Sequence, residues 1–221
     1  MLRVNNLVGF GAGRLGKPVT FIGSNTDEGN SSSYTFTDEP IGDASADRLV
    51  IFGIGGVRNN SGNATCTGIT FGGSGGTLIT SSGARQVAAI GYLLITSGTT
   101  STIVASFDQT MRSVVYFVCH ITELDSNTAN DTGFDTDAAG ALLTTTLDVP
   151  SNGVTIGMLS CAGGGTVDWV GTGNRFTETD LAENADNHIA ASNGLTANAT
   201  HVLSGDHSSP NLVAMVAGSW G

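Results

Sequence analysis

The stretch RSVVYFVCHIT, residues 112–122, is dense in β-branched and aromatic residues and contains no Gly or Pro. Residues of these types favour β-strands. Similar short runs recur along the chain, for example DRLVIFGIGGV at 47–57 and NLVAMVAGSW at 211–220, with segments rich in Gly, Ser, Thr and Asn between them. This spacing is typical of a sandwich. We therefore predict an all-β fold, namely an antiparallel, jelly-roll-like β-sandwich with a Gly-rich N-terminal arm.

The same stretch is apolar on both of its faces. Side chains alternate along a strand, so Val114 and Tyr116 share one face while Phe117 and Cys119 share the other. The runs NLVAMVAGSW and GVTIGMLSCAG have the same character. A simple antiparallel sandwich exposes one face of each sheet to water and alternates cleanly. These strands therefore need a second cover, for which another subunit is the economical source. The alternative is that their small residues are tolerated in water.

Turn and loop segments can also be assigned from composition. The Gly-rich residues after Phe71 and the sequence PSNG at 150–153 predict hairpin turns, because Gly and Asn accept positive φ. The two most polar and acidic segments, 126–140 and 171–187, are expected to be exposed loops at the tip of the sandwich.

The composition indicates a scaffold rather than a freely diffusing enzyme. Of the 221 residues 12% are charged and 32 are Gly, whereas ordinary domains carry roughly 25% charged residues and about 7% Gly. A hydrophobic share of 39% is enough for a core, and this length fits one large all-β domain. We assign residues 1–17 to an extended arm and residues 18–221 to a single β-sandwich domain.

The charge balance excludes two classes of partner. A formal net charge of −11 leaves few cations to neutralise phosphates, which argues against nucleic acid and against an anionic membrane surface. No run approaches the roughly 18 apolar residues of a membrane span. The first residues, MLRVNNLVGFGAG, also lack the apolar segment of a signal peptide. We expect neither nucleic acid nor a membrane as a partner.

Cofactor and catalytic signatures are weak. The cysteines Cys66, Cys119 and Cys161 show no zinc-site spacing and are expected to be buried free thiols. GAGRLG at 11–16 matches G-x-G-x-x-G, but a β-type run follows it instead of the helix that a dinucleotide site needs. Cys119 and His120 are adjacent along a strand and point to opposite faces, which forbids a dyad. We predict no cofactor and no enzymatic activity.

The histidines offer one alternative. His188, His201 and His207 would bind a metal together with Asp186 or Asp206 if adjacent strands brought them together. No fixed spacing supports this arrangement, so surface or cross-strand histidines are the expectation.

The acidic residues Asp125, Asp131, Asp135 and Asp137 offer a second alternative, because DTDAAG loosely resembles a calcium loop. A solvated acidic loop is the default, and a structural Ca²⁺ is the alternative. Trp169 and Trp220 are expected as core anchors.

The succession of segments carries a resemblance. It comprises NNLVGFGAG near the N-terminus, SYTFTDEPIGDASADRLVIFGI, TLITSSGARQVAAIGYLLITSGTTSTIVASF, MRSVVYFVCHIT and a closing LVAMVAGSW. This order resembles a group of β-sandwich virion structural proteins of tailed bacteriophages, of a type common in marine and cyanobacterial phages. The resemblance covers nearly the whole chain from about residue 5. It implies a structural role on the head or the tail of the particle, and no active-site residues.

The resemblance and the composition together indicate a non-enzymatic capsid decoration or cement protein that binds the outside of a phage shell and stabilises it. The expected partners are copies of itself, as a homotrimer or another symmetric oligomer, and the major capsid protein or tail proteins. The expected location is the virion, after assembly in the host cytoplasm. The alternative is a tail-associated adhesin for a host surface glycan or protein, and a virion-borne hydrolase is a third. The expected assembly contacts are Val4, Asn5, Leu7, Phe10, Arg14, Lys17, Asp131, Phe134, Trp169 and Arg175.

Overall fold

A computed structural model describes residues 17–81, 85–137, 142–161, 167–170, 186–195, 197–208 and 213–221, and of 170 and 186–195 it describes the backbone. Every regular element in these residues is a β-strand, and every strand pair is antiparallel. The prediction of an all-β, antiparallel sandwich is therefore confirmed. The predicted arm, apart from Lys17, lies outside the described residues. Among the described residues, no helix is long and apolar enough to cross a membrane.

The first half of the chain builds one large sheet, here called sheet A. Its strand order is β5-β4-β8-β3-β7-β6, and β1 and β2 also pair with β8. Its strands are β1 (Val19–Asp27), β2 (Ser31–Pro40), β3 (Leu49–Arg58), β4 (Cys66–Phe71), β5 (Ser74–Gly75), β6 (Thr77–Thr80), β7 (Gln86–Leu94) and β8 (Thr100–Ile121).

The long strand β8 makes sheet A curl. Its first part pairs with β2 and β4, and its second part pairs with β1 and β3. Because the partners change along β8, the sheet bends until β4 faces β7. A Cβ added at Gly91 of β7 would lie 2.7 Å from the side chain of Ile69 of β4. The nearly closed sheet encloses the first core, which includes Phe36, Phe52 and Tyr116.

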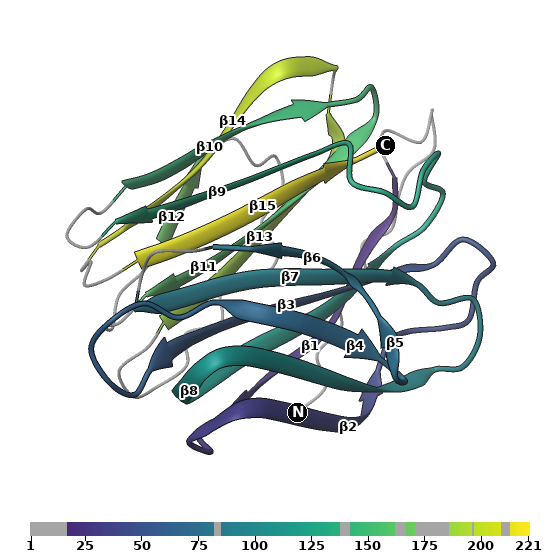
Figure 1. Cartoon of the computed structure of the whole chain (residues 1–221). Helices are drawn as coiled ribbons and strands as arrows, with labels where there is room; N and C mark the ends of the chain where they lie inside the picture. The colour runs from purple at the N-terminus through teal and green to yellow at the C-terminus, as the bar shows by residue number, and fades with distance from the viewer. Residues whose placement is uncertain are drawn as a thin grey trace, which may run out of the picture.

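The second half of the chain builds two smaller sheets. Sheet B has the order β13-β11-β15-β9, and sheet C has the order β10-β14-β12. In Figure 1 sheet B lies between sheet A and sheet C. The strands are β9 (Asp131–Asp137), β10 (Leu142–Val149), β11 (Gly153–Cys161), β12 (Val167–Val170), β13 (Asp186–Leu195), β14 (Asn198–His207) and β15 (Val213–Trp220).

The stacking creates two further cores. The second core lies between the outer face of sheet A and sheet B, where Phe117 and Cys119 meet Met158 and Trp220. The third core lies between sheets B and C and includes Trp169. Sheet B therefore has a core on each face, and every residue of β11 and β15 is buried.

The inference that another subunit must cover the strands that are apolar on both faces is wrong. In β8, Val114 and Tyr116 enter the first core, while Phe117 and Cys119 enter the second. The chain covers both faces of its central strands with its own sheets. The non-alternating pattern thus marks inner layers of a stack, and it is no indication of a subunit contact.

Both predicted turns are present, but only one joins paired strands. Gly72 and Gly73 have positive φ between β4 and β5, which pair with each other. At 150–153, Asn152 has a φ of 59° and the N–H of Gly153 donates to the carbonyl of Pro150 at 3.0 Å. The strands on either side of this second turn enter different sheets, β10 in sheet C and β11 in sheet B. It is a corner between layers, so the prediction of a hairpin at this position is wrong.

Candidate functional site

An open depression of about 420 Å³ lies at the end of sheet B where β15 finishes. Three segments far apart in the sequence form it: the loop between β8 and β9, the corner between β10 and β11, and the residue after β15. The lining residues are Asp125, Ser126, Thr128, Ala129, Asn130, Pro150 and Gly221.

Backbone hydrogen bonds fix the loop that forms most of this lining, residues 122–130. The N–H of Asp125 donates to the carbonyl of Gly221 at 2.6 Å. The N–H of Ala129 donates to the hydroxyl of Tyr92 at 3.2 Å. The loop is thus tied both to the end of β15 and to strand β7 of the neighbouring sheet.

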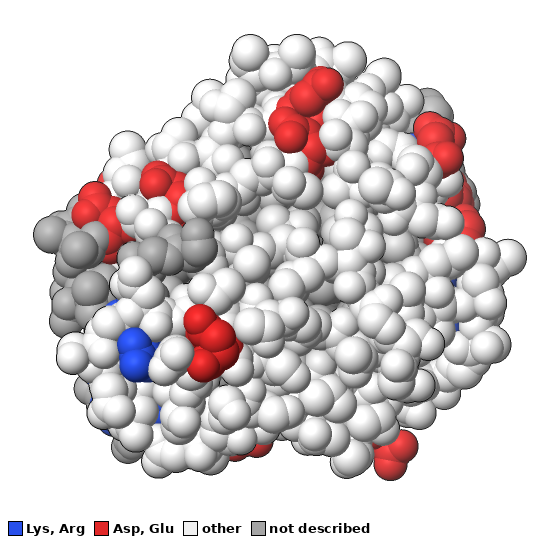
Figure 2. All heavy atoms as spheres, viewed as in Figure 1, with Lys and Arg blue, Asp and Glu red and all other residues white. Residues whose placement is uncertain are grey.

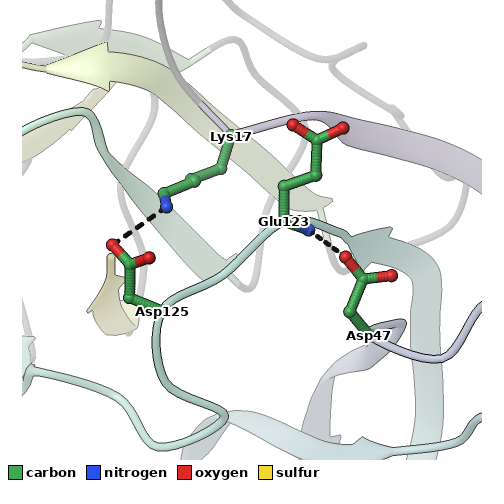
Figure 3. Close-up of polar contacts among 4 residues, drawn as sticks. All are labelled: Lys17, Asp47, Glu123 and Asp125. Carbon is green, nitrogen blue, oxygen red and sulfur yellow. Dashed lines mark hydrogen bonds and ion pairs between the residues drawn. The ribbon is translucent and has the colours of Figure 1, made fainter.

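The chain enters its first strand beside this depression. The ammonium of Lys17 lies 3.0 Å from the carboxylate of Asp125 (Figure 3), and the N–H of Thr122 donates to the carbonyl of Pro18 at 3.1 Å. The Asp125 side chain is 86% exposed, and exposed ion pairs stabilise a fold by only about 0–1 kcal/mol. The contact therefore matters for position, because it holds Lys17 beside the depression.

Asp47 holds the same loop at Glu123. Its Oδ2 accepts a hydrogen bond from the N–H of Glu123 at 2.7 Å (Figure 3), and its Oδ1 accepts one from the hydroxyl of Ser45. Glu123 has a φ of 63°, a conformation uncommon for residues other than Gly. The hydrogen bond that Glu123 donates to Asp47 helps to keep the loop in this conformation.

Sequence reasoning missed a buried charge close to this loop. The guanidinium of Arg48 is fully buried and donates to the carbonyls of Gly42, Ile95, Ser97 and Gly98 at 2.6 to 3.0 Å. Burial lowers the pKa of this guanidinium, which nevertheless stays charged. No local pattern identifies such a residue, since its partners lie in two connections far apart along the chain.

Three of the predicted loop acids lie on a strand. Asp131, Asp135 and Asp137 belong to β9, so the expectation of an exposed loop over 126–140 is wrong for that part of the segment. Asp131 Oδ2 accepts from the N–H of Asp148, and Asp135 Oδ2 accepts from the N–H of Thr144, both at 2.8 Å. Both donors are on β10, the edge strand of sheet C. These carboxylates bind an unpaired strand edge instead of converging on one another.

The histidines occupy separate environments in the described residues. His120 Nδ1 lies 3.2 Å from the carbonyl of Ile41. His207 is fully buried on β14, where it pairs with Val167 of β12 and is thus a cross-strand histidine, and His201 is half-buried on the same strand. The side chain of His188 lies outside the described residues. Within the described part of the chain, no three His, Cys, Asp or Glu side chains gather as metal ligands.

The three cysteines are buried thiols outside any disulfide, as predicted. Burial raises the pKa of the Cys66 thiol to about 12. Burial also raises the pKa of Cys119, which lies in the second core. Both thiols remain protonated at neutral pH, where a thiol is a weak nucleophile.

The predicted assembly contacts fall into different settings. Trp169 is 3% exposed in the third core, so its assignment as an assembly contact is wrong, while Trp169 and Trp220 are confirmed as core residues. Phe134 is 53% exposed on β9. The remaining predicted contacts, apart from Lys17 and Asp131, lie outside the described residues, namely Val4, Asn5, Leu7, Phe10, Arg14 and Arg175.

The surface is sparsely charged. On the face shown in Figure 2 most of the area carries no charged side chain, the acidic side chains form separate groups, and very little basic surface is visible. This matches the low charged fraction of 12% and the excess of acidic residues.

Comparisons with known proteins assign no family. No family profile matches the chain, and no curated protein matches it. Among solved structures, the PBSX exported protein XepA is similar over 95% of this chain and 88% of that chain, with 11% sequence identity and a TM-score of 0.29. A TM-score of this size carries no argument about function.

Proposed function

We propose that this chain is a non-enzymatic structural protein of a bacteriophage particle, a decoration protein that binds the outside of the shell and stabilises it. The observation that carries the proposal is the self-contained stack of sheets, in which the chain encloses all three cores with its own strands. Such a domain is a rigid block that needs no partner to complete its cores. The sequence resemblance to virion proteins of tailed phages is the reason for proposing a phage particle as its place of action.

The exposed part of the outer face of sheet A, over β2, β4 and the first part of β8, suits adhesion to a repetitive surface. Thr35, Val104 and Thr70 lie side by side on β2, β8 and β4, and Ser33 pairs with Ser106 next to them. All five are exposed or half-exposed, and none is charged. Short side chains lose less rotamer freedom on burial than Lys, Arg or Glu. Weak contacts of this kind add up when many copies sit on a symmetric lattice.

The test of this proposal is the copy number in particles purified from the phage or prophage that encodes the chain. Quantitative mass spectrometry against the major shell protein is expected to give about one copy per shell subunit or about one per three. A number on the order of a few tens per particle would overturn the decoration role and favour a tail-associated adhesin. Absence from the particle would overturn both.

The face itself can be tested with matched variants. We expect Thr35→Glu combined with Thr70→Glu to lower occupancy on the particle at least tenfold, because two buried, unpaired charges would oppose binding. Thr146→Glu is the control, since Thr146 is exposed on β10 of sheet C, at the opposite end of the stack. Equal occupancy of the two variants would show that sheet A is not the bound face.

A further inference from the structure

Basic residues are concentrated before the first strand. Residues 1–17 contain three of the chain's eight Lys and Arg, namely Arg3, Arg14 and Lys17, and none of its 19 Asp and Glu. Among the remaining cations, Arg48 is buried and bound to backbone carbonyls. The N-terminal segment is therefore opposite in charge to the rest of the chain.

The N-terminal segment also combines apolar side chains with a long reach. Between its two arginines it reads VNNLVGFGAG, without a charge and with Val4, Leu7, Val8 and Phe10 among small residues. Sixteen extended residues span roughly 50 Å. This is enough to cross from one domain to another.

The depression beside Lys17 matches this segment in chemistry. Ala129 and Pro150 give it an apolar wall, and Ser126 and Thr128 are short. Asp125, at its rim, is 86% exposed and already binds one cation of the segment, Lys17. A volume of about 420 Å³ accommodates a large apolar side chain.

Building on the proposed assembly function, we infer that this depression receives residues 1–16 of a second copy of this chain. Phe10 of that copy fills the depression, and its Arg14 reaches Asp125. Lys17, which follows the segment, lies beside the depression of its own domain. A symmetric pair or ring can therefore exchange segments over short distances, and the contacts close on themselves.

The first test is self-association of the full-length chain by analytical ultracentrifugation. The wild type is expected to be an oligomer that weakens as salt rises, because salt screens exposed charges. Thr128→Trp, which fills the depression, and Arg14→Glu are each expected to weaken association at least tenfold. Thr67→Trp, at an exposed position on β4, is the matched control and keeps wild-type association. A monomeric wild type, or Thr128→Trp associating like Thr67→Trp, would overturn the inference.

The second test identifies which copy supplies the segment. In the full-length chain, Phe10→Cys combined with Thr128→Cys is oxidised mildly, and the products are separated on a non-reducing gel. The native cysteines are buried and do not interfere. Covalently linked chains are expected, and Phe10→Cys with Thr67→Cys is expected to give none. A disulfide within one chain would assign the segment to its own domain and overturn the exchange, and so would the absence of any disulfide.

These results are separable from the outcome for the proposed function. Linked chains together with absence from particles would leave the exchange site standing and remove the virion role. High copy number in particles together with a monomeric wild type would support the virion role and overturn the exchange site.

Discussion

Arg48 lies where the connection between β2 and β3 meets the connection between β7 and β8. Its guanidinium binds one carbonyl from the first connection, Gly42, and three from the second, Ile95, Ser97 and Gly98. A buried charge needs hydrogen bonds to compensate for its lost hydration. The four carbonyls supply them, and Arg48 in turn ties the two irregular connections together.

We expect Arg48→Met to lower the free energy of unfolding by about 3 kcal/mol, because it removes the four hydrogen bonds that the buried guanidinium donates. Chemical denaturation monitored by circular dichroism measures the change. Arg112→Met is the control, since Arg112 is exposed, and should stay within about 0.5 kcal/mol of the wild type. Similar losses in the two variants would contradict the role of Arg48.

Cys66 makes the stability depend on alkaline pH. Burial raises its pKa to about 12 in the folded chain, whereas an unfolded thiol titrates near about 8.5. Above that value the unfolded chain loses the proton first, so stability falls as pH rises from about 8.5 toward 12. Between pH 8 and pH 10 the wild type should lose about 2 kcal/mol more than Cys66→Ala does. Chemical denaturation of both proteins at the two pH values measures this difference. If the wild type and Cys66→Ala lose the same free energy of unfolding between pH 8 and pH 10, Cys66 does not contribute.

At the scale of elements, β9 and β10 join two sheets through side chains. Asp131 and Asp135 on β9 accept the N–H groups of Asp148 and Thr144 on β10. The two acceptors are four residues apart on β9, and their donors are four residues apart on β10 in the reverse order along the chain. Unpaired strand edges invite aggregation, and here two carboxylates occupy the places of partner carbonyls.

Removal of one carboxylate should weaken this junction. Asp135→Ala removes the acceptor of the exposed Thr144 N–H and is expected to lower the free energy of unfolding by about 0.5–1.5 kcal/mol. Asp206→Ala is the matched control, because Asp206 is exposed on β14 of the same sheet. If the two substitutions lower the free energy of unfolding equally in thermal or chemical denaturation, the junction has no net effect on stability.

Gly133, between the two acids, has a steric role. A Cβ at this position would overlap Thr145 Oγ1 of β10, whereas a Cβ at Gly68 of β4 would meet nothing within 4 Å. We expect Gly133→Ala to destabilise by about 1–3 kcal/mol through overpacking, and Gly68→Ala to be neutral or slightly stabilising. The midpoints of urea unfolding of the two variants are compared with that of the wild type. An unchanged midpoint for Gly133→Ala would show that β10 can shift to accommodate the added methyl group.

The strands could be predicted from the sequence because β-branched and aromatic runs between turn residues are a local signal. The sheet that covers the second face of RSVVYFVCHIT could not be predicted from the sequence, because sheet order depends on pairings between residues far apart. The acids of β9 were expected in a loop because charge usually marks solvent, and their acceptor role depends on the edge of β10. Of the candidate site, Lys17 was predicted as a contact residue. The loop and corner that meet beside it come together only in the folded chain.

At the scale of the whole molecule, sheet B connects the second core with the third. Its strands β11 and β15 contribute to the second core on one face and to the third on the other. Neither core can open without exposing apolar residues of the same strands. We therefore expect the domain to unfold as one unit.

The two tryptophans report on different cores, Trp220 on the second and Trp169 on the third. In Trp169→Phe and in Trp220→Phe, the fluorescence of the remaining tryptophan should follow the same denaturation curve as the far-ultraviolet circular dichroism, as in a two-state transition. A fluorescence transition that precedes the loss of strand signal in either variant would show that the cores unfold separately.

The division of the sheets along the chain has a consequence for synthesis on the ribosome. Sheet A uses residues 19–121, whereas sheets B and C use residues 131–220. At about 5–20 residues per second, translation of the second half takes roughly 5–20 s. During that time sheet A can form while Leu49, Ile51 and Phe117 still lack the sheet that buries them. Each nascent chain then exposes an apolar face for seconds, which favours association between neighbouring nascent chains and binding by chaperones.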